Sequence, residues 1–362
     1  MSSLTENFII MTMLFFELFL LAFAVAVALN AIAIRVFPRL GLLDFPKRYG
    51  LARERLPYPL GIIAVLTFLI FFPALAEGTM EARGILIGVL LLAVTTIIDD
   101  RTPLPPTVRA GVHAPVALLI FVSGARIYTL TNPLASIAIG GPIIPLDRLT
   151  VTVPIFGSLP VWSGIFTVLW LGLTINALNW FDGIPGQVSV LSMIAFLTIG
   201  LLAVSARVDQ PSLAILAFVL AGIAGASLLF TFPPPRAVLG DTGAMFFGLL
   251  IGILTIYSGG KVATAFLVLG VPLIDFVLVI ARRILKGKSI VRGDAKDEHL
   301  HHRLLLKGWT PRQVIALTAG IGTLFGLSAL FLSTFQKFLA ALVLFALMLF
   351  LSWYSRPKKQ HE

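Results

Sequence analysis

The sequence predicts an all-α integral membrane protein, a polytopic bundle of about 10–11 transmembrane helices with a small external β-hairpin. Of its 362 residues, 58% are hydrophobic and 12% are charged, and the mean hydropathy is +1.00. A water-soluble domain carries roughly 25% charged residues, because polar groups must cover its surface. Lipid must therefore cover much of this chain, and we treat residues 1–362 as one integral-membrane domain.

Apolar runs interrupted by charged residues, Pro or Gly mark the spans. The first run follows a segment without Lys or Arg and lacks a small-residue cleavage pattern near its end, so we expect it to be retained. Gly322 and Gly326 in the tenth run indicate close helix packing. The runs lie at about 8–36, 60–76, 84–98, 107–124, 160–179, 187–206, 211–231, 243–258, 261–281, 313–333 and 336–354.

Lys and Arg are divided unequally between alternate connections of these spans. One side receives 20 of them and the other side six. The positive-inside rule then puts the N-terminus outside and the C-terminus in the cytoplasm of a cell (inner or plasma) membrane. Topology and anionic head groups account for the net charge of +10, so we expect no nucleic-acid partner.

The longest external connection, about 125–160, predicts the β-hairpin. Its short β-branched runs, Ile137–Ile139 and Thr150–Val153, are separated by Gly-Gly-Pro and Pro-Leu-Asp turns. The chain contains no cysteine, which excludes disulfides, a thiolate nucleophile and Cys-ligated metals.

The unusual polar groups gather on the predicted cytoplasmic side, beginning with Asp99 and Asp100. The apolar run 84–98 that precedes them spans only about 22 Å as a helix, so we expect the pair just after the helix, at the lipid boundary. Adjacent carboxylates there are costly unless a cation or a reaction needs them. A solvated helix end is the alternative to a metal-binding or proton-accepting pair.

A second motif combines amides, a carboxylate and glycines. Asn176, Asn179 and Asp182 are spaced by three residues, so a helix places them on one face. Such oxygen ligands are typical of a hard cation, and Gly183 and Gly186 permit close backbone approach. Amide hydrogen bonds between helices and a helix C-cap are the alternative.

The third motif is Gly240-Asp241-Thr242-Gly243, at the start of the eighth span. Asp241 could serve as an N-cap. A helix N-terminus with flanking glycines also suits phosphate, and an aspartate beside phosphate indicates Mg²⁺.

The fourth motif lies in the basic loop 282–312, which holds three of the five histidines. We disfavour zinc, because His301 and His302 should point apart on a regular backbone and no cysteine is present. Imidazole and guanidinium donors suit phosphate, and a solvated basic loop is the alternative. The motif comprises Glu298, His299, His301, His302 and Arg303.

Together these motifs resemble those of the polyprenyl-phosphate N-acetylhexosamine-1-phosphate transferases of glycosyltransferase family 4, over about residues 40–310. Pro272 and Asp275 also resemble family positions. The His-Leu-His-His-Arg-Leu segment is similar to the undecaprenyl-phosphate GlcNAc-1-phosphate transferase branch. The chain departs from the family pattern at Pro185, where Asp or Asn is usual, and in having only Gly61 where two glycines are usual.

The resemblance implies that the chain transfers an N-acetylhexosamine 1-phosphate, GlcNAc 1-phosphate first among them, from a UDP-sugar to a polyprenyl phosphate. UMP is released, and the product begins cell-envelope glycan synthesis. Mg²⁺, with Mn²⁺ as a substitute, is the implied cofactor, and a homodimer is compatible with this interpretation. The active-site loops would be about 37–59, 99–109, 179–187, 232–243 and 282–312.

The resemblance also implies roles. Asp241 with Asn179 or Asp182 would hold Mg²⁺, and Asp99 or Asp100 would orient the lipid phosphate or accept its proton. Asp182 would belong to both the metal-binding and the catalytic residues. Substrate would be bound by Asn176, Gly183, Gly240, His299, His301, His302 and Arg303.

Three other functions stay open from the sequence. One is an ion-coupled transporter, because such carriers also place carboxylates in membranes. Another is a phospho-N-acetylmuramoyl-pentapeptide transferase of the same family. The last is a membrane scaffold without activity.

Overall fold

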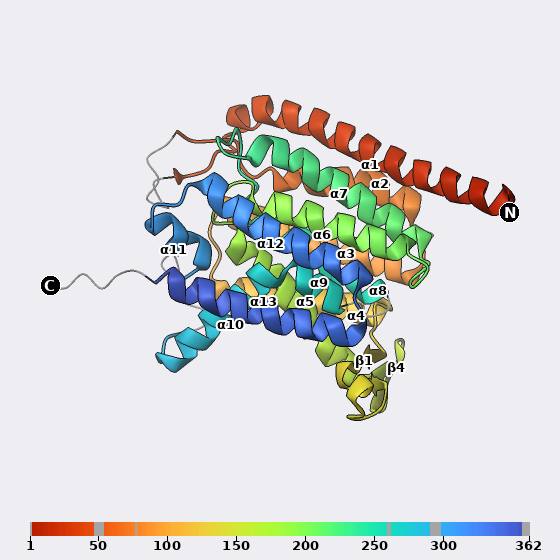
Figure 1. Ribbon diagram of the computed structural model, residues 1–362. Coiled ribbons are helices and arrows are strands. Elements are labelled where there is room, and N and C mark those ends of the chain that lie inside the picture. Colours follow the sequence, from red (N-terminus) through yellow and green to blue (C-terminus); the bar gives the residue numbers. More distant parts are fainter. Residues whose placement is uncertain (1, 47–53, 77, 259–261, 290–297, 357–362) are drawn as a thin grey trace.

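The computed structural model describes residues 2–46, 54–76, 78–258, 262–289 and 298–356, and it is a helical bundle (Figure 1). Within that part of the chain, nine helices are long and apolar enough to cross a membrane, so the protein is a multi-pass membrane protein. These helices are α1 (Ser2–Val36), α3 (Met80–Arg101), α4 (Pro106–Ser123), α5 (Val161–Phe181), α6 (Gln187–Val204), α7 (Pro211–Thr231), α8 (Gly240–Tyr257), α12 (Pro311–Phe331) and α13 (Thr334–Tyr354).

Two further predicted spans differ in form from these nine. The second is α2 (Gly61–Leu75), a shorter apolar helix of 15 residues. The ninth, predicted as one helix over 261–281, is instead α9 (Val262–Val268) and α10 (Gly270–Leu285), bent by 85°. The ring of Pro272 would clash with the carbonyl of Val268 in a continuous helix. As a result α10 points away from the direction of α9.

The most enclosed helix of the bundle is α8. Protein buries 89% of its most apolar 18 residues, against 17% for α13 and 22% for α1. A Cβ on Gly248 would lie 2.6 Å from the carbonyl oxygen of Thr174 in α5, so α8 and α5 pack backbone against backbone. This packing sets the start of α8 beside the end of α5.

The carboxylates of the first motif lie inside a helix, not after it. Helix α3 begins at Met80, four residues before the predicted run 84–98, because the Thr79 hydroxyl caps it by accepting a hydrogen bond of 3.2 Å from the Ala82 N–H. At its other end α3 continues to Arg101, so Asp99 and Asp100 form part of its last turn. Hydropathy alone underestimated this helix, because its polar ends continue beyond the apolar run.

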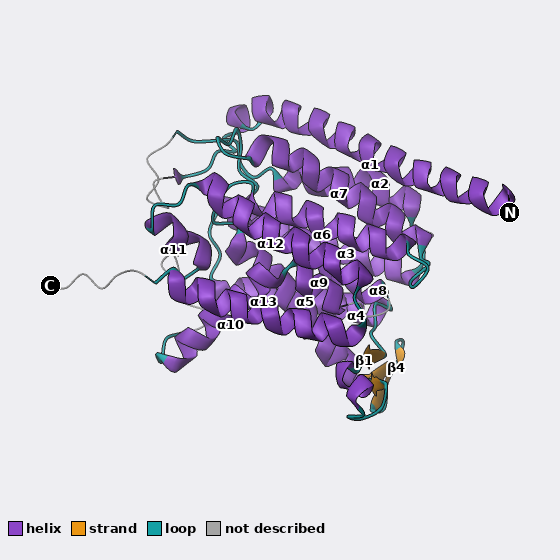
Figure 2. Cartoon of the chain, viewed as in Figure 1, coloured by secondary structure: helices purple, strands orange, loops and turns teal. Residues whose placement is uncertain are grey.

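The connection 125–160 forms two hairpins instead of one (Figure 2). Strand β1 (Thr129–Thr131) pairs with β2 (Ile143–Pro145), and β3 (Thr150–Val153) pairs with β4 (Gly157–Pro160). The strand predicted at Thr150–Val153 is confirmed. The strand predicted at Ile137–Ile139 is wrong, because the 3₁₀ helix η3 (Pro133–Ile137) includes Ile137 and is followed by a left-handed Ala138 (φ 62°). The Asn132 amide donates to the carbonyls of Ile139 and Gly141 and closes the loop into a turn.

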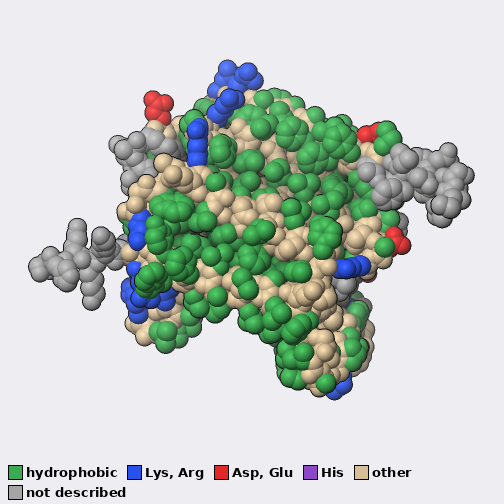
Figure 3. Space-filling view, in the orientation of Figure 1, with side chains coloured by type: hydrophobic (Ala, Val, Ile, Leu, Met, Phe, Trp, Pro, Cys, Tyr) green, Lys and Arg blue, Asp and Glu red, His purple; other side chains and the backbone are tan. Residues whose placement is uncertain are grey.

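The two ends of the bundle differ in charge. Figure 3 shows Lys and Arg mainly at the end that carries helix α11 (Leu300–Leu306) and the 3₁₀ helix η1 (Pro38–Leu40), while apolar side chains cover the middle. The hairpins lie at the other end (Figure 1). Parts of two predicted active-site loops, 47–53 and 290–297, lie outside the described residues.

Candidate active site

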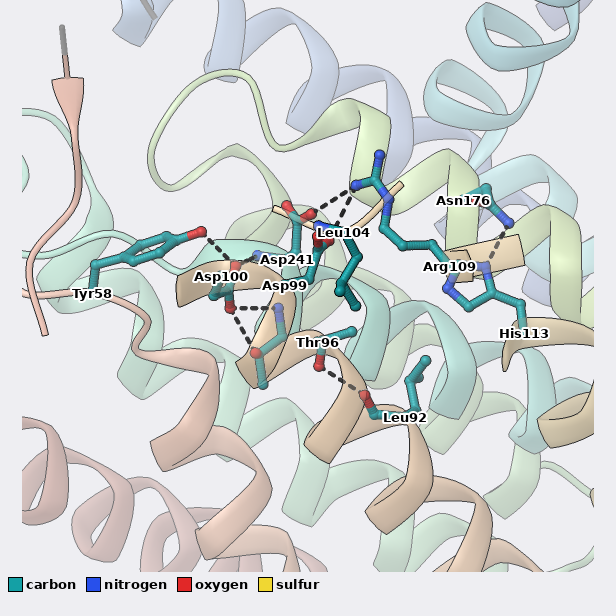
Figure 4. A network of polar contacts seen from close by, with 11 residues as sticks. Tyr58, Leu92, Thr96, Asp99, Asp100, Leu104, Arg109, His113, Asn176 and Asp241 are labelled. Atoms are coloured by element: carbon teal, nitrogen blue, oxygen red, sulfur yellow. Dashed lines mark hydrogen bonds and ion pairs between the residues drawn. The ribbon is translucent and has the colours of Figure 1, made fainter. Parts of the chain in front are cut away.

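Carboxylates from the last turn of α3 and the first turn of α8 meet around one guanidinium (Figure 4). Arg109 Nη1 lies 3.2 Å from Asp99 Oδ2 and 3.2 Å from Asp241 Oδ2. The side chain of Asn179 donates a hydrogen bond to Asp241. The structure thus brings together Asp99 of α3, Asn179 of α5 and Asp241 of α8. We call Asp99, Asp100, Asp182 and Asp241 the carboxylate cluster.

Asp100 has a different environment from its neighbour Asp99. It accepts hydrogen bonds from the hydroxyl of Tyr58, from the N–H groups of Asp241 and Thr242, and from the Thr242 hydroxyl. The bonds to the two N–H groups cap the start of α8 from another helix. Asp241 does not cap α8, because the N-cap position is Leu239. Asp100 therefore fixes α8 against α3.

Asp99 has fewer partners than Asp100. It accepts one backbone hydrogen bond, of 2.6 Å from Leu104, besides its ion pair with Arg109. Its side chain is 5% exposed, against 32% for Asp241. Asp99 and Asp241 both line a cavity of about 130 Å³, so their carboxylates face space that a ligand group can enter.

Asp182 joins the cluster from the end of α5, where it accepts a hydrogen bond from the Gly240 N–H. Burial raises the pKa of Asp182 well above its usual value, and the charges of Asp241 and Asp100 raise it further. Gly240 has φ +81°, and a Cβ there would lie 2.5 Å from the Pro59 side chain and 3.1 Å from Asp100 Oδ2. Only glycine fits this position.

Asn176 does not join the cluster. Its amide nitrogen lies 3.3 Å from His113 Nδ1 on α4 and 2.8 Å from the Gly172 carbonyl oxygen (Figure 4). This is a hydrogen bond between helices, the alternative that the sequence left open for an amide at this place. Substrate binding by Asn176 stays a prediction.

Internal pairs hold the segment from Glu298 to Arg303, which we call the histidine loop. His299 Nδ1 lies 2.9 Å from Asp275 Oδ2, and the Leu300 N–H donates to Asp275 Oδ1 at 3.1 Å. Arg283 Nε donates to Glu298 Oε2 at 2.6 Å. Through these contacts α10 fixes the start of the loop.

Arg303, predicted to bind substrate, points toward α13. Its Nη1 donates to the Ser352 carbonyl oxygen at 3.0 Å, and the side chain is almost fully buried. In this arrangement Arg303 anchors the loop, and a contact with phosphate stays a prediction.

His301 and His302 face Gly183, beside the carboxylate cluster. A Cβ on Gly183 would lie 2.0 Å from His301 Nε2 and 2.9 Å from His302 Nε2, so only glycine fits between them. The two rings are 4.2 Å apart, so the expectation that they point apart is wrong. Both ring nitrogens of His301 are buried without a hydrogen-bond partner among the described residues. Burial lowers the pKa of His301 well below its usual value, and the neighbouring imidazoles and Arg303 lower it further.

The donor set of the cluster fits a hard divalent cation. Carboxylate and amide oxygens are the ligands that Mg²⁺ prefers. Of the four carboxylates in the cluster, Asp99 and Asp241 pair with the guanidinium of Arg109. Arg109 shows that a positive charge is favoured between Asp99 and Asp241. As they are placed, the described side chains form no ready-made coordination shell of three acidic or imidazole groups. An ion held by both Asp99 and Asp241 would take the place of the Arg109 guanidinium.

The sequence did not single out three residues that line the cavity: Asp44, Tyr58 and Arg109. In the sequence, Arg109 was used only as one of the 20 Lys and Arg residues on the predicted cytoplasmic side. An arginine near the start of an apolar helix usually has a buried partner or a ligand, which was the signal that could have found it. The Asp44 carboxylate accepts a hydrogen bond of 2.7 Å from the Leu56 N–H. No pattern pointed to Tyr58, whose role depends on the contact with Asp100.

Comparison with known proteins supplies the family. Residues 82–259, which include three of the four motifs, match the family described as glycosyl transferase family 4. Over these residues the chain belongs to this family. It is 28% identical over 345 residues to the "Probable undecaprenyl-phosphate N-acetylglucosaminyl 1-phosphate transferase" of Bacillus subtilis (strain 168), covering 92% of this chain and 89% of that one.

Two further relatives show a similar identity. The undecaprenyl-phosphate alpha-N-acetylglucosaminyl 1-phosphate transferase of Escherichia coli (strain K12) is 28% identical over 337 residues, covering 88% of this chain and 85% of that one. The decaprenyl-phosphate N-acetylglucosaminephosphotransferase of Mycobacterium leprae (strain TN) is 28% identical over 323 residues, covering 81% and 75%. All three names describe transfer to a polyprenyl phosphate.

Proposed function

We propose that this chain transfers GlcNAc 1-phosphate from UDP-GlcNAc to a polyprenyl phosphate and releases UMP. An oxygen of the lipid phosphate attacks the sugar-bearing phosphorus, and the bond from that phosphorus to the UMP oxygen breaks. The observation that carries the proposal is the meeting of Asp99, Asp241 and Arg109 at one end of a membrane bundle. A lipid and a water-soluble substrate can both reach such a place.

Phosphoryl transfer depends mainly on positioning and on neutralising the charge of the oxygens. Asp241, Asn179 and Asp182 would hold Mg²⁺, which when bound supplies positive charge to the donor's pyrophosphate. Asp99 is better placed than Asp100 to face the lipid phosphate, because four donors already occupy the oxygens of Asp100. Asp100 would act by positioning the start of α8.

The histidine loop would bind the donor from the other side. The Nε2 atoms of His301 and His302 converge on Gly183, one residue from Asp182. As hydrogen-bond donors they suit phosphate oxygens, and so does the planar guanidinium of Arg109. The excess of Lys and Arg at this end supports an active site that faces the cytoplasm, with the N-terminus outside.

The alternatives are less well supported. The names of the relatives refer to N-acetylglucosamine, which disfavours a muramoyl-pentapeptide donor. Helices α9 and α10 are bent by 85° at a break, a feature that carriers also have, but Asp99 and Asp241 lie at the ends of long helices and not at mid-helix, where carriers bind their cargo.

The test is UMP release by the purified protein in detergent with Mg²⁺ and undecaprenyl phosphate. We expect turnover with UDP-GlcNAc and not with UDP-N-acetylmuramoyl-pentapeptide. The control variant is Asp147→Asn, at an exposed carboxylate in the hairpin connection, which should keep full turnover. No UMP from any donor, with folded protein, would contradict the proposal and leave transport or a scaffold.

A further inference from the structure

The two hairpins form an almost uncharged protrusion at the end of the bundle opposite the active site. We call residues 127–160, all of them described, the outer knob. Its only charged side chains are Asp147 and Arg148. Figure 1 shows the knob projecting sideways, beside the ends of α4 and α5, and not covering the end of the bundle.

Apolar side chains of the knob are exposed on both faces of its hairpins. The exposed fractions run from 41% for Phe156 to 96% for Ile155, with Ile143 at 54% and Val151 at 53%. A two-stranded hairpin is marginally stable in water, and large exposed apolar patches indicate a contact surface. Something apolar must therefore cover the knob.

Ile155 gives the strongest indication of a cover. It sits at the tip of the second hairpin, in a turn closed by a hydrogen bond of 3.2 Å from the Phe156 N–H to the Val153 carbonyl oxygen. Its φ is +78°, a conformation that favours Gly or Asn in such turns and disfavours a β-branched residue. In water, Ile155 would combine an unfavourable backbone conformation with an unfavourable exposure of apolar surface. In lipid, the apolar side chain would be removed from water, which is favourable.

The lipid-facing surface of α5 leads to the knob. Trp162, Ile165 and Leu169 are 52%, 47% and 67% exposed, and their spacing places them on one face of the helix. Trp162 lies in the first turn of α5, directly after the knob, and tryptophan is enriched where a membrane meets water. The knob continues this apolar surface sideways at the level of the helix ends (Figure 3).

We propose that the outer knob is an interfacial anchor, which inserts the Ile155 turn into the head-group and upper acyl region of the leaflet opposite the active site. The near absence of charge favours burial of apolar side chains over attraction to anionic lipid. The partner is therefore the lipid bilayer itself, and the proposal does not depend on the reaction.

Because the chain contains no cysteine, single labelling sites can be made without background. The variant Ile155→Cys carries a nitroxide, in phosphatidylcholine vesicles. Leu169→Cys on α5 is the reference for lipid, and Arg39→Cys, exposed in η1, is the reference for water. We expect collisions with a water-soluble nickel complex to be several-fold rarer at 155 than at 39, and collisions with oxygen to approach those at 169.

Two results would overturn the proposal. Nickel access at 155 equal to that at 39 would place the knob in water. Shielding from both reagents together with dipolar broadening between labels would place a second copy of the chain on the knob. The Val151→Cys label provides an independent site if Ile155→Cys does not fold. Adding Ile155→Asp to that variant should raise nickel access at 151 several-fold, and no change would contradict insertion.

Discussion

The carboxylate cluster and the histidine loop lie side by side but are stabilised in opposite ways. In the cluster, the Arg109 guanidinium pairs with two of the four carboxylates, Asp99 and Asp241, while Asp100 and Asp182 accept hydrogen bonds from the start of α8. The histidine loop is held to α10 by two polar pairs, His299 with Asp275 and Glu298 with Arg283. The contrast fits our proposal that the cluster binds a cation together with substrate, whereas internal contacts already hold the loop that presents the imidazoles.

The largest expected effect comes from removing charge in the cluster. We expect Asp241→Asn to lower UMP release by about 100-fold or more, the usual size of a lost electrostatic contact with a reacting group. Asp99→Asn should have a similar effect. Neither variant should lower protein abundance, because each removes a charge from a crowded cluster. Full turnover by Asp241→Asn would contradict the metal assignment.

Asp100→Asn separates positioning from charge. The amide NH₂ would face N–H and hydroxyl donors, so we expect unfolding to become easier by about 1–3 kcal/mol, the cost of unmade buried hydrogen bonds. The measurement is the thermal midpoint in detergent, beside that of Asp241→Asn. Equal midpoints for the two variants would show that Asp100 does not fix the start of α8.

Removing the metal should affect the cluster and not the loop. We expect Mg²⁺ at about 100 times its dissociation constant to stabilise the protein by about 2.7 kcal/mol over protein in EDTA. Thermal unfolding with and without Mg²⁺ measures the shift. Asp241→Asn should lose most of it, and Arg109→Gln should enlarge it, because the guanidinium competes for the same carboxylates. An unchanged shift in Asp241→Asn would place the ion elsewhere.

A smaller effect is expected when the loop loses its attachment to α10. In Asp275→Asn the amide oxygen can still accept from the Leu300 N–H, while the charge opposite His299 is lost. We expect turnover to fall about tenfold, for a loss of roughly 1.5 kcal/mol from a hydrogen bond to a charged group. The stabilisation by Mg²⁺ should persist, which distinguishes this variant from Asp241→Asn.

The smallest expected effect is the pH dependence of stability caused by His301. Its pKa in the folded protein is lowered, so below about pH 6.5 the unfolded chain binds a proton that the folded protein does not. Stability therefore falls as the pH drops from 6.5 toward the folded pKa, by at most about 1.4 kcal/mol per pH unit. Unfolding midpoints between pH 7.5 and 5.5 measure this slope. His301→Gln should flatten it, and an unchanged slope would assign it to another group.

Sequence patterns predicted helices and strands correctly where neighbouring residues alone determine the structure. Hydropathy found the spans, and Thr150–Val153 formed the predicted strand because its β-branched residues lie between turn residues. The same reasoning was wrong at Ile137–Ile139, where the distant Asn132 side chain organises the loop. It was also wrong over 261–281, where the helix is bent by 85° before Pro272, a residue that disfavours a continuous helix.

From composition and the order of the motifs, the sequence alone predicted a multi-pass membrane protein with its polar groups at one end. This was possible because the hydropathy and the length of a helix depend on consecutive residues. Only the tertiary structure decided the partners. Arg109 joins residues 10 and 132 positions away, Asp100 caps a helix 141 positions away, and Gly183 meets His301. Those contacts depend on how α3, α5, α8 and α11 pack, and close packing at glycines is a property of pairs of helices that neither helix encodes by itself.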